Sequence, residues 1–348
     1  MASVVSLRAP TPALAGAVHL PGSKSETNRS LILAAQHRTG MTLYRPSDSA
    51  DSRVLGQALQ ASGYHLQQAA TYWRLTPPSA PPTQMVTMDL EQAGTACRFF
   101  TALACVLPQT TELTGSARLA QRPLAPLVQA LRQAGAVILC DGLPLTIEGQ
   151  PHWRPRYLEV DARASSQFLS ALMLLGPSLF PGSELRLNPP ELASAPYAAL
   201  TRQLLHRAGI NWGMQWPSFY LQQNSLKATE LHIEADWSGA SYWLGLACLG
   251  PTHLRLHGLS PDSAQGDAGQ LEVYQSWGLH TAWEEGAEGH VLVIAREDTG
   301  SLVPAFELDF QHMPDLAQTF AVLATQAAGP CHLRGLGTLP HKETDRLA

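Results

Sequence analysis

Five segments of the chain are apolar on nearly every side, and each follows a short polar stretch. Their sequences are SLILAA, GTACRFFTALAC, SSQFLSALMLL, SGASYWLGLACL and PDLAQTFAVLA. Helices that are apolar all round lie in the interior of a protein. The polar starts are 70, 71, 73 and 77 residues apart, which indicates an internal structural repeat, although serine- and glycine-rich helix starts also recur by chance. These starts are Lys24, Gly94, Ser165, Ser238 and Asp315.

Amphipathic helices and strands fill the intervals between these segments. Helical spacing of apolar residues predicts surface helices at 51–62 and in LAQRPLAPLVQALRQAGA, which ends at Gly135. Each repeat then has a buried helix, a surface helix and strands, so the fold is α/β (α+β) with helices inside and sheets outside. The other predicted helices are 30–37, 95–106, YAALTRQLLHRAG and QLEVYQSWGL, and the predicted strands fall within 3–8, 16–20, 63–90, 136–160 and 212–234.

The length of 348 residues exceeds that of a usual single core, so we expect two domains, with the crossover within 224–236. Hydrophobic residues make up 45% of the chain and charged residues 15%, which is typical of a packed globular protein. The net charge of −5 provides no basic field and argues against nucleic acid as a partner. Any cationic site must therefore be local.

The cysteines and the apolar runs indicate a cytoplasmic protein. The five cysteines are odd in number and contain no C-x-x-C pair, as expected for reduced thiols. No run approaches the roughly 20 apolar residues of a membrane span, and the first residues do not resemble a signal peptide. No histidines or cysteines have the spacing of metal ligands.

The stretch Leu20–Gln36, LPGSKSETNRSLILAAQ, predicts an anion site. A polar loop with Lys24, Asn28 and Arg29 leads into an apolar helix, whose first N–H groups and dipole favour negative charge. The G-x-x-x-x-G-K spacing of a P-loop is absent. The chain has only three lysines, and two of them, Lys24 and Lys342, lie in polar motifs. An arginine-biased composition is the alternative explanation.

The other polar helix starts have a functional and a structural interpretation. Gly94-Thr95 allows a ligand close to the backbone or forms an ordinary cap. Arg122-Pro123 opens a helix and presents a guanidinium to an anion, or is a surface arginine. Ser165-Ser166-Gln167 is a phosphate cradle or a cap. Asp315 is a carboxylate of raised pKa or an N-cap. Lys342–Arg346 forms one face of a helix or a solvated charge run.

Taken in chain order, these sequence motifs resemble those of the 3-phosphoshikimate 1-carboxyvinyltransferase (EPSP synthase) family. The resemblance extends over essentially the whole chain. The resemblance rests on LPGSKSETNRSLILAA, AGTACRFFTALAC, SSQFLSAL, ASAPY, ADWSGASYWL, HMPDLAQTFAVLAT and KETDRLA. It implies transfer of the enolpyruvyl group of phosphoenolpyruvate to the 5-hydroxyl of shikimate 3-phosphate, with release of phosphate. It also implies no organic cofactor, no required metal, and two domains of three βαβαββ units each. We expect a cytoplasmic monomer of aromatic amino-acid biosynthesis, with no nucleic acid or membrane partner.

The resemblance assigns a role to each candidate site residue. Lys24 lies between both substrates, Asp315 is the base at the 5-hydroxyl, and Glu343 is the acid at the vinyl carbon. The phosphoenolpyruvate site is formed by Gly94, Arg122 and Arg346. The shikimate 3-phosphate site is formed by Ser25, Arg29, Ser165, Ser166, Ser194, Tyr197 and Lys342, and Gln167 lies where the substrates meet.

The chain departs from the family pattern at Gln92, Ala195 and Thr338, and a sixth repeat has no counterpart before Ala348. We therefore expect a first domain of residues 1–19 and 231–348 that is incomplete, a second domain of residues 20–230, and little or no activity of this chain alone. A UDP-N-acetylglucosamine enolpyruvyltransferase is a rival, but the loop TGSARLAQRP lacks its cysteine. A non-catalytic binder of shikimate 3-phosphate is the other alternative.

Overall fold

The computed structural model describes residues 13–80, 82, 84–286 and 289–348, so the strand predicted at 3–8 lies outside the described residues. Internal contacts divide the chain into two compact units. The first contains the described residues up to Leu20 with Ala235–Ser263 and Asp267–Arg334, and the second contains Pro21–Glu234, Ala264–Gly266 and Gly335–Ala348. The predicted domains, 1–19 with 231–348 and 20–230, stay a prediction, and differ from these units chiefly at Gly335–Ala348.

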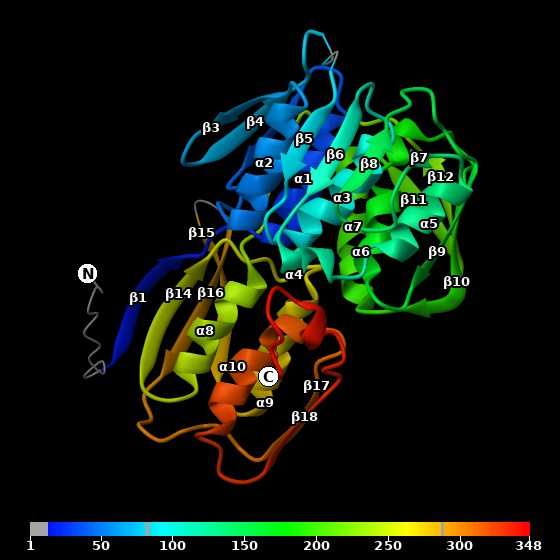
Figure 1. The fold of residues 1–348 in the computed structure, drawn as a ribbon. Coiled ribbons are helices and arrows are strands. Elements are labelled where there is room, and N and C mark those ends of the chain that lie inside the picture. The colour runs from blue at the N-terminus through cyan, green and yellow to red at the C-terminus, as the bar shows by residue number, and fades with distance from the viewer. Residues whose placement is uncertain (1–12, 81, 83, 287–288) are drawn as a thin grey trace, which may run out of the picture. The chain divides into compact units, whose positions relative to one another are not determined.

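Three four-stranded sheets form the outside of the second unit (Figure 1). Their strands are β2 (Met41–Tyr44), β3 (His65–Gln68), β4 (Tyr72–Thr76), β5 (Val86–Asp89), β6 (Thr110–Thr114), β7 (Val137–Ile138), β8 (Leu145–Glu148), β9 (Tyr157–Ala162), β10 (Glu184–Leu192), β11 (Asn211–Gln215), β12 (Ser218–Gln223) and β13 (Glu230–His232). The orders are β13-β2-β4-β3, β5-β6-β8-β7 and β9-β10-β12-β11. Each begins with a parallel pair and ends with antiparallel strands. This recurring order is the structural form of the repeat inferred from the spacing of the polar starts.

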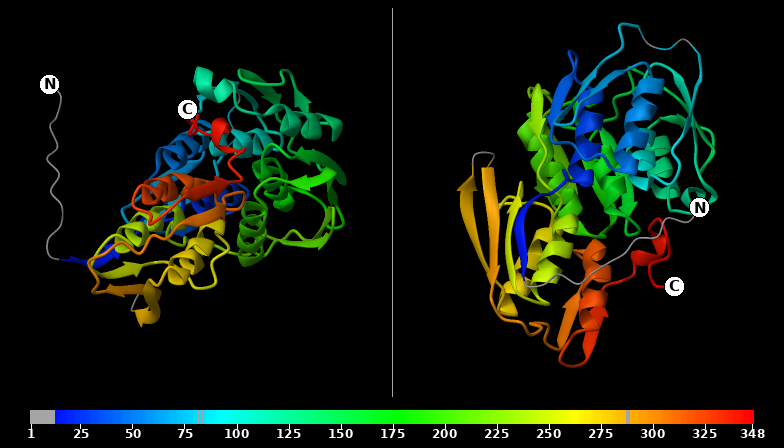
Figure 2. Two further views of the ribbon diagram at one scale, coloured as in Figure 1. Left: turned by 90° about the horizontal axis from the view of Figure 1, so that it is seen from below. Right: turned by 90° about the vertical axis from the view of Figure 1, so that its left-hand side faces the viewer.

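Buried helices fill the interior of the second unit. Its helices are α1 (Lys24–Ala35), α2 (Ala50–Ala61), α3 (Gly94–Ala104), α4 (Ala117–Ala120), α5 (Ala125–Gln133), α6 (Ser166–Met173) and α7 (Ala195–Ala208), with the 3-10 turns η1 (Gly176–Ser178) and η4 (Leu339–His341). α3 is buried along its whole length and contacts both α1 and α6. Figure 2 shows the blue helices α1 and α2 side by side. Phe99 and Phe100 on α3 have no exposed surface, and truncating either to alanine removes about 3–5 kcal/mol of stability.

The first unit contains one more four-stranded sheet and a two-stranded parallel sheet among its described residues. Its elements are β1 (Leu14–His19), α8 (Trp237–Ala247), β14 (Thr252–His257), η2 (Gly266–Gly269), α9 (Gln270–Ser276), β15 (His280–Gly286), β16 (Gly289–Arg296), β17 (Phe306–Asp309), η3 (Pro314–Leu316), α10 (Ala317–Ala324) and β18 (Cys331–Arg334). The large sheet, β1-β14-β16-β15, repeats the order of the second unit, and β17 pairs with β18. The rings of Tyr274 and Phe320 stack at 5.2 Å in the core.

Two further observations concern the state of the cysteines and the length of the helices among the described residues. All five cysteines are free, and burial raises the pKa of Cys97 to about 11 and those of Cys105 and Cys248 to about 12. No helix within the described part of the chain has the length and apolar character needed to cross a bilayer.

The prediction that the first helix begins at Ser30 is wrong. α1 begins at Lys24, because the Ser23 hydroxyl caps it by accepting the Glu26 N–H at 3.4 Å. The Thr27 hydroxyl also donates to the Ser23 carbonyl oxygen at 2.8 Å. The polar motif is therefore the first part of the helix itself rather than a loop leading into it.

Two further predictions about helices are wrong. LAQRPLAPLVQALRQAGA does not form one helix, since α4 ends at Ala120 and α5 begins at Ala125. Pro123 has no N–H to continue the helix and restricts Arg122 before it, so Arg122 lies in the bend and does not open a helix. Of the two interpretations left open for Lys342–Arg346, the helical one does not apply, because in this last segment only Leu339–His341 forms a turn of 3-10 helix.

Candidate active site

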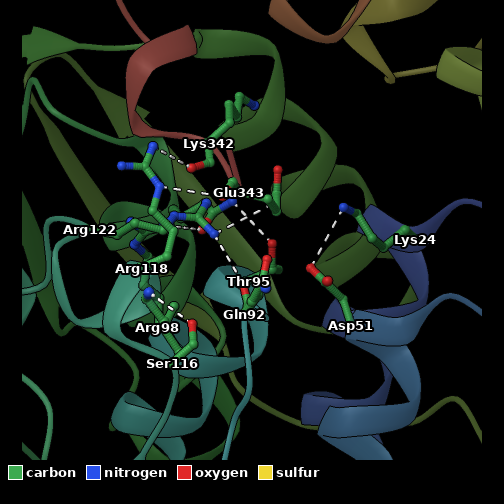
Figure 3. A network of polar contacts seen from close by, with 12 residues as sticks. Lys24, Asp51, Gln92, Thr95, Arg98, Ser116, Arg118, Arg122, Lys342 and Glu343 are labelled. Carbon is green, nitrogen blue, oxygen red and sulfur yellow. Dashed lines mark hydrogen bonds and ion pairs between the residues drawn. The ribbon is translucent and has the colours of Figure 1, made fainter. Parts of the chain in front are cut away.

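Lys24 and Asp51 bring the first turns of α1 and α2 together. Lys24 Nζ lies 3.6 Å from Asp51 Oδ2, and Figure 3 shows the two side chains pointing toward each other. The Ser49 hydroxyl caps α2 by accepting the Ser52 N–H at 3.3 Å, which fixes the position of Asp51 in the first turn. The Lys24 side chain is 41% exposed, so the ammonium remains accessible to a ligand.

Arg122 is held by the start of α3. Its Nη1 donates to the Gln92 carbonyl oxygen at 3.2 Å, and its side chain is only 6% exposed. A Cβ on Gly94 would lie 2.4 Å from Arg122 Nη1, so only glycine leaves room for the guanidinium. In this structure the guanidinium of Arg122 makes the close approach to the Gly94 backbone that was predicted for a ligand.

Glu343 lies between two guanidinium groups. Its Oε1 is 3.5 Å from Arg122 Nη1, and its Oε2 is 3.4 Å from Arg346 Nη2. Burial favours the neutral acid, but the charges of Lys24, Arg122 and Lys342, with a backbone hydrogen bond, hold the pKa of the carboxyl below its usual value. Glu343 is therefore ionised at neutral pH.

Gln167 links the start of α6 to α3. Its Oε1 accepts from Arg98 Nη1 at 2.8 Å, and its Nε2 donates to Thr95 Oγ1 at 3.2 Å. Ser165 caps α6, since its hydroxyl accepts the Gln167 N–H at 3.2 Å. Ser166 is 3% exposed, so it offers little hydroxyl surface in this conformation.

Arg29 is 1% exposed and its donors meet protein acceptors. Nε donates to Thr201 Oγ1 at 2.7 Å, Nη1 to the Ser25 carbonyl oxygen at 2.9 Å, and Nη2 to Ser170 Oγ at 3.4 Å and the Tyr197 carbonyl oxygen at 3.3 Å. Four of the five guanidinium N–H groups are thus engaged within the protein. Its predicted contact with a substrate carboxylate stays a prediction.

The remaining predicted residues lie at helix starts or in the last segment. Ser194 precedes α7 in a left-handed conformation, with φ of 49° and ψ of 60°, and Tyr197 is in the first turn of that helix. Lys342 is half-buried and follows η4. Asp315 belongs to the first unit, in η3, where Met313 and not Asp315 is the N-cap residue. The predicted roles of these residues stay predictions.

Three charged residues of this network were not predicted. Arg98, Arg118 and Asp51 all appear in Figure 3 beside the predicted residues. Arg98 is buried, and burial first and then the charge of Arg122 lower its pKa to about 10. The sequence signal that would have identified Arg98 is a single arginine within the otherwise apolar segment GTACRFFTALAC.

The described residues contain no group of three histidine, cysteine, aspartate or glutamate side chains placed to hold a metal ion. The second unit instead gathers Lys24, Arg98, Arg122 and Arg346 around one carboxylate, that of Glu343. Such a cluster is suited to anionic ligands, because guanidinium groups bind carboxylates and phosphates through charge-assisted hydrogen bonds.

Comparison with known proteins gives consistent matches. The family described as EPSP synthase (3-phosphoshikimate 1-carboxyvinyltransferase) matches residues 9–348. The 3-phosphoshikimate 1-carboxyvinyltransferase of Bordetella petrii is 36% identical, and the alignment covers 95% of this chain and 76% of that protein. The enzyme of the same name from Bacteroides fragilis is 34% identical, with 95% of this chain and 75% of that protein covered.

Solved structures support the fold. The EPSP synthase of Acinetobacter baumannii superposes with a TM-score of 0.68 at 15% identity, covering 94% of this chain and 93% of that chain. The enolpyruvyl transferase NikO of Streptomyces tendae gives a TM-score of 0.67 at 16% identity, covering 93% of this chain and 76% of that chain. The predicted two-domain α/β fold of enolpyruvyltransferases is thereby confirmed. From the match over residues 9–348 and the 34–36% identity to the bacterial relatives, this chain belongs to the EPSP synthase family.

Proposed function

We propose that this chain transfers the enolpyruvyl group of phosphoenolpyruvate to the 5-hydroxyl of shikimate 3-phosphate and releases phosphate. This is a reaction of the shikimate pathway, which leads to chorismate and the aromatic amino acids. Family membership supports the reaction. The observation that carries the assignment of the site is the carboxylate of Glu343 held between Arg122 and Arg346, 3.5 and 3.4 Å away.

The charges of the substrates explain this composition. Each substrate carries a phosphate and a carboxylate, so binding both brings several negative charges into one site. Lys24, Arg122 and Arg346 offset that repulsion. We assign Arg122 to the phosphoenolpyruvate site and Arg346 to the carboxylate of that substrate. The buried Arg98 adds positive charge behind Gln167, where we place the meeting point of the substrates.

The addition step needs two proton transfers, and the elimination step needs a third. The 5-hydroxyl loses its proton as its oxygen bonds to C2 of phosphoenolpyruvate, and C3 gains a proton. Loss of phosphate from C2 and of a proton from C3 then restores the double bond. We assign the hydroxyl proton to Asp315 as base and the C3 proton to Glu343 as acid, because the two steps need carboxyl groups of different pKa.

We assign shikimate 3-phosphate to the polar helix starts of α6 and α7. Hydroxyls and free N–H groups at a helix start bind phosphate oxygens well. Gly94 serves the phosphoenolpyruvate side by leaving room for Arg122. The residues proposed to bind shikimate 3-phosphate are Ser25, Arg29, Ser165, Ser166, Gln167, Ser194, Tyr197 and Lys342. A monomer in the cytoplasm stays a proposal.

Phosphate release tests the function. The chain is mixed with both substrates, and with each alone, and inorganic phosphate is followed over time. From the sequence we expect little or no turnover of this chain alone, whereas family membership predicts phosphate release that requires both substrates and is lost in Glu343→Gln. If shikimate 3-phosphate binds by calorimetry but no phosphate appears, the chain is a binding protein and the proposed reaction is wrong for it.

A further inference from the structure

Arg118 binds the backbone of the segment that carries Glu343. Its Nη2 donates to the carbonyl oxygens of Pro340 at 2.6 Å and Lys342 at 3.0 Å, and its Nε donates to that of Glu343 at 3.3 Å. Figure 3 shows the guanidinium beside Lys342 and Glu343. One side chain thus satisfies three carbonyl groups that lie more than 220 positions away in the sequence.

The backbone that carries Arg118 is held in place by the rest of the second unit. α4 is capped by the Ser116 hydroxyl, which accepts the Leu119 N–H at 3.2 Å. The Ser116 N–H donates to the Glu91 carbonyl oxygen at 2.8 Å, and Leu119 is 4% exposed. Arg118 therefore extends from an anchored turn rather than from a free loop.

The segment Gly335–Ala348 has few apolar contacts of its own. Leu339 is its one buried residue, and after η4 the backbone has no helix or strand partner to accept or donate regularly. Carbonyl groups that are outside regular structure and removed from water need donors from elsewhere. The planar fork of a guanidinium reaches several acceptors at once, which an ammonium cannot reproduce.

We propose that Arg118 is a positioning residue, which fixes the backbone of Pro340–Glu343 so that the Glu343 carboxylate lies against Arg122. It touches neither carboxylate oxygen, so it acts through Glu343 and does not itself transfer a proton. The consequence for turnover rests on the function proposed above. The clamp itself does not, because it is present without substrate.

Amide hydrogen exchange of the full chain tests the clamp directly. The N–H groups of Leu339, His341 and Lys342 donate within the segment and report on its order. We expect Arg118→Ala to speed their exchange about tenfold or more, as charge-assisted hydrogen bonds to three carbonyls are lost. Arg118→Lys should lie between this variant and the wild type, and exchange in α3 should not change in either.

Arg53→Ala is the matched control. Arg53 also donates to a backbone carbonyl oxygen, that of Asp48 at 2.8 Å, but lies on α2. It should leave exchange at 339–342 unchanged. Equal exchange in Arg118→Ala and the wild type would overturn the clamp. If Arg118→Ala does not fold, Arg118→Lys decides, and wild-type exchange in that folded variant would equally overturn the proposal.

Turnover gives the second measurement. In Arg118→Ala we expect kcat to fall about 10- to 100-fold from misplacement of the acid, with a smaller change in KM. Because Glu343 then loses part of its contact with Arg122, its pKa should rise and the matching limb of the pH–rate profile should move to higher pH. An unmoved limb contradicts positioning of the carboxylate. Absent turnover in the wild type counts against the proposed function, and hydrogen exchange still tests the clamp.

Discussion

Arg122 Nη1 lies 3.5 Å from Glu343 Oε1, although 221 positions separate the two residues. The other carboxylate oxygen lies 3.4 Å from Arg346 Nη2, so the two arginines assigned to phosphoenolpyruvate face a carboxylate of the protein itself. An ionised Glu343 must gain a proton before it acts as an acid. A substrate anion that binds Arg122 and Arg346 weakens their interactions with the Glu343 carboxylate. The pKa of Glu343 then rises, so substrate binding is coupled to proton uptake.

Glu343→Gln should lower kcat by about 10²-fold or more, the usual contribution of a positioned general acid. Binding should survive, because the amide keeps the shape while removing a negative charge that competes with phosphoenolpyruvate for the arginines. Steady-state phosphate release gives kcat, and calorimetry gives the affinity. A variant that keeps wild-type kcat would exclude Glu343 as the acid.

The same variant should show how Glu343 contributes to stability with pH. The folded carboxyl has a pKa below its ordinary value of 4.5, so its ionised form stabilises the protein above that pH. The contribution is lost as pH falls through the lower folded value, where the wild type carries a neutral acid like the amide. Urea unfolding of wild type and Glu343→Gln should therefore differ at pH 7, by at most about 1 kcal/mol for a partly exposed pair, and converge in acid. A difference that grows toward low pH would contradict the ion pairs.

Gly94→Ala should damage the site while leaving the fold intact. The new methyl group would stand 2.4 Å from Arg122 Nη1 and 2.5 Å from its Cζ, and the flexible side chain can move away. We expect affinity for phosphoenolpyruvate to fall about tenfold or more, since a charge-assisted contact is lost. The melting temperature should stay near that of the wild type.

Gly142→Ala is the control for this substitution, because a Cβ there meets no atom within 4 Å. Both variants are compared by calorimetry with phosphoenolpyruvate in the presence of shikimate 3-phosphate. If Gly94→Ala binds phosphoenolpyruvate with wild-type affinity, the position of Arg122 against Gly94 is not required for binding this substrate.

The fold was largely predictable because its helices and strands follow local periodicity. The apolar segments that start at Gly94 and Ser165 form helices as expected. The repeat inferred from the spacing of the polar starts appears in the structure as the same strand order in each four-stranded sheet. The start of α1 was missed, because capping by Ser23 overrides the polar character of the first turn. Arg118 was missed for a different reason. Its partners are carbonyl groups more than 220 residues away, and no local pattern encodes such a contact.

Gln167→Ala should destabilise the second unit. The amide accepts from the buried Arg98 at 2.8 Å and donates to Thr95 at 3.2 Å, so its loss leaves a desolvated guanidinium N–H without its acceptor. We expect the free energy of unfolding to fall by about 1–3 kcal/mol, the cost of an unsatisfied buried group. Gln67→Ala, at an exposed amide on β3, should change it by less than about 0.5 kcal/mol. Urea titration of both variants measures the difference. Equal stability would mean that water replaces the amide at Arg98, and that Gln167 is retained for the substrates alone.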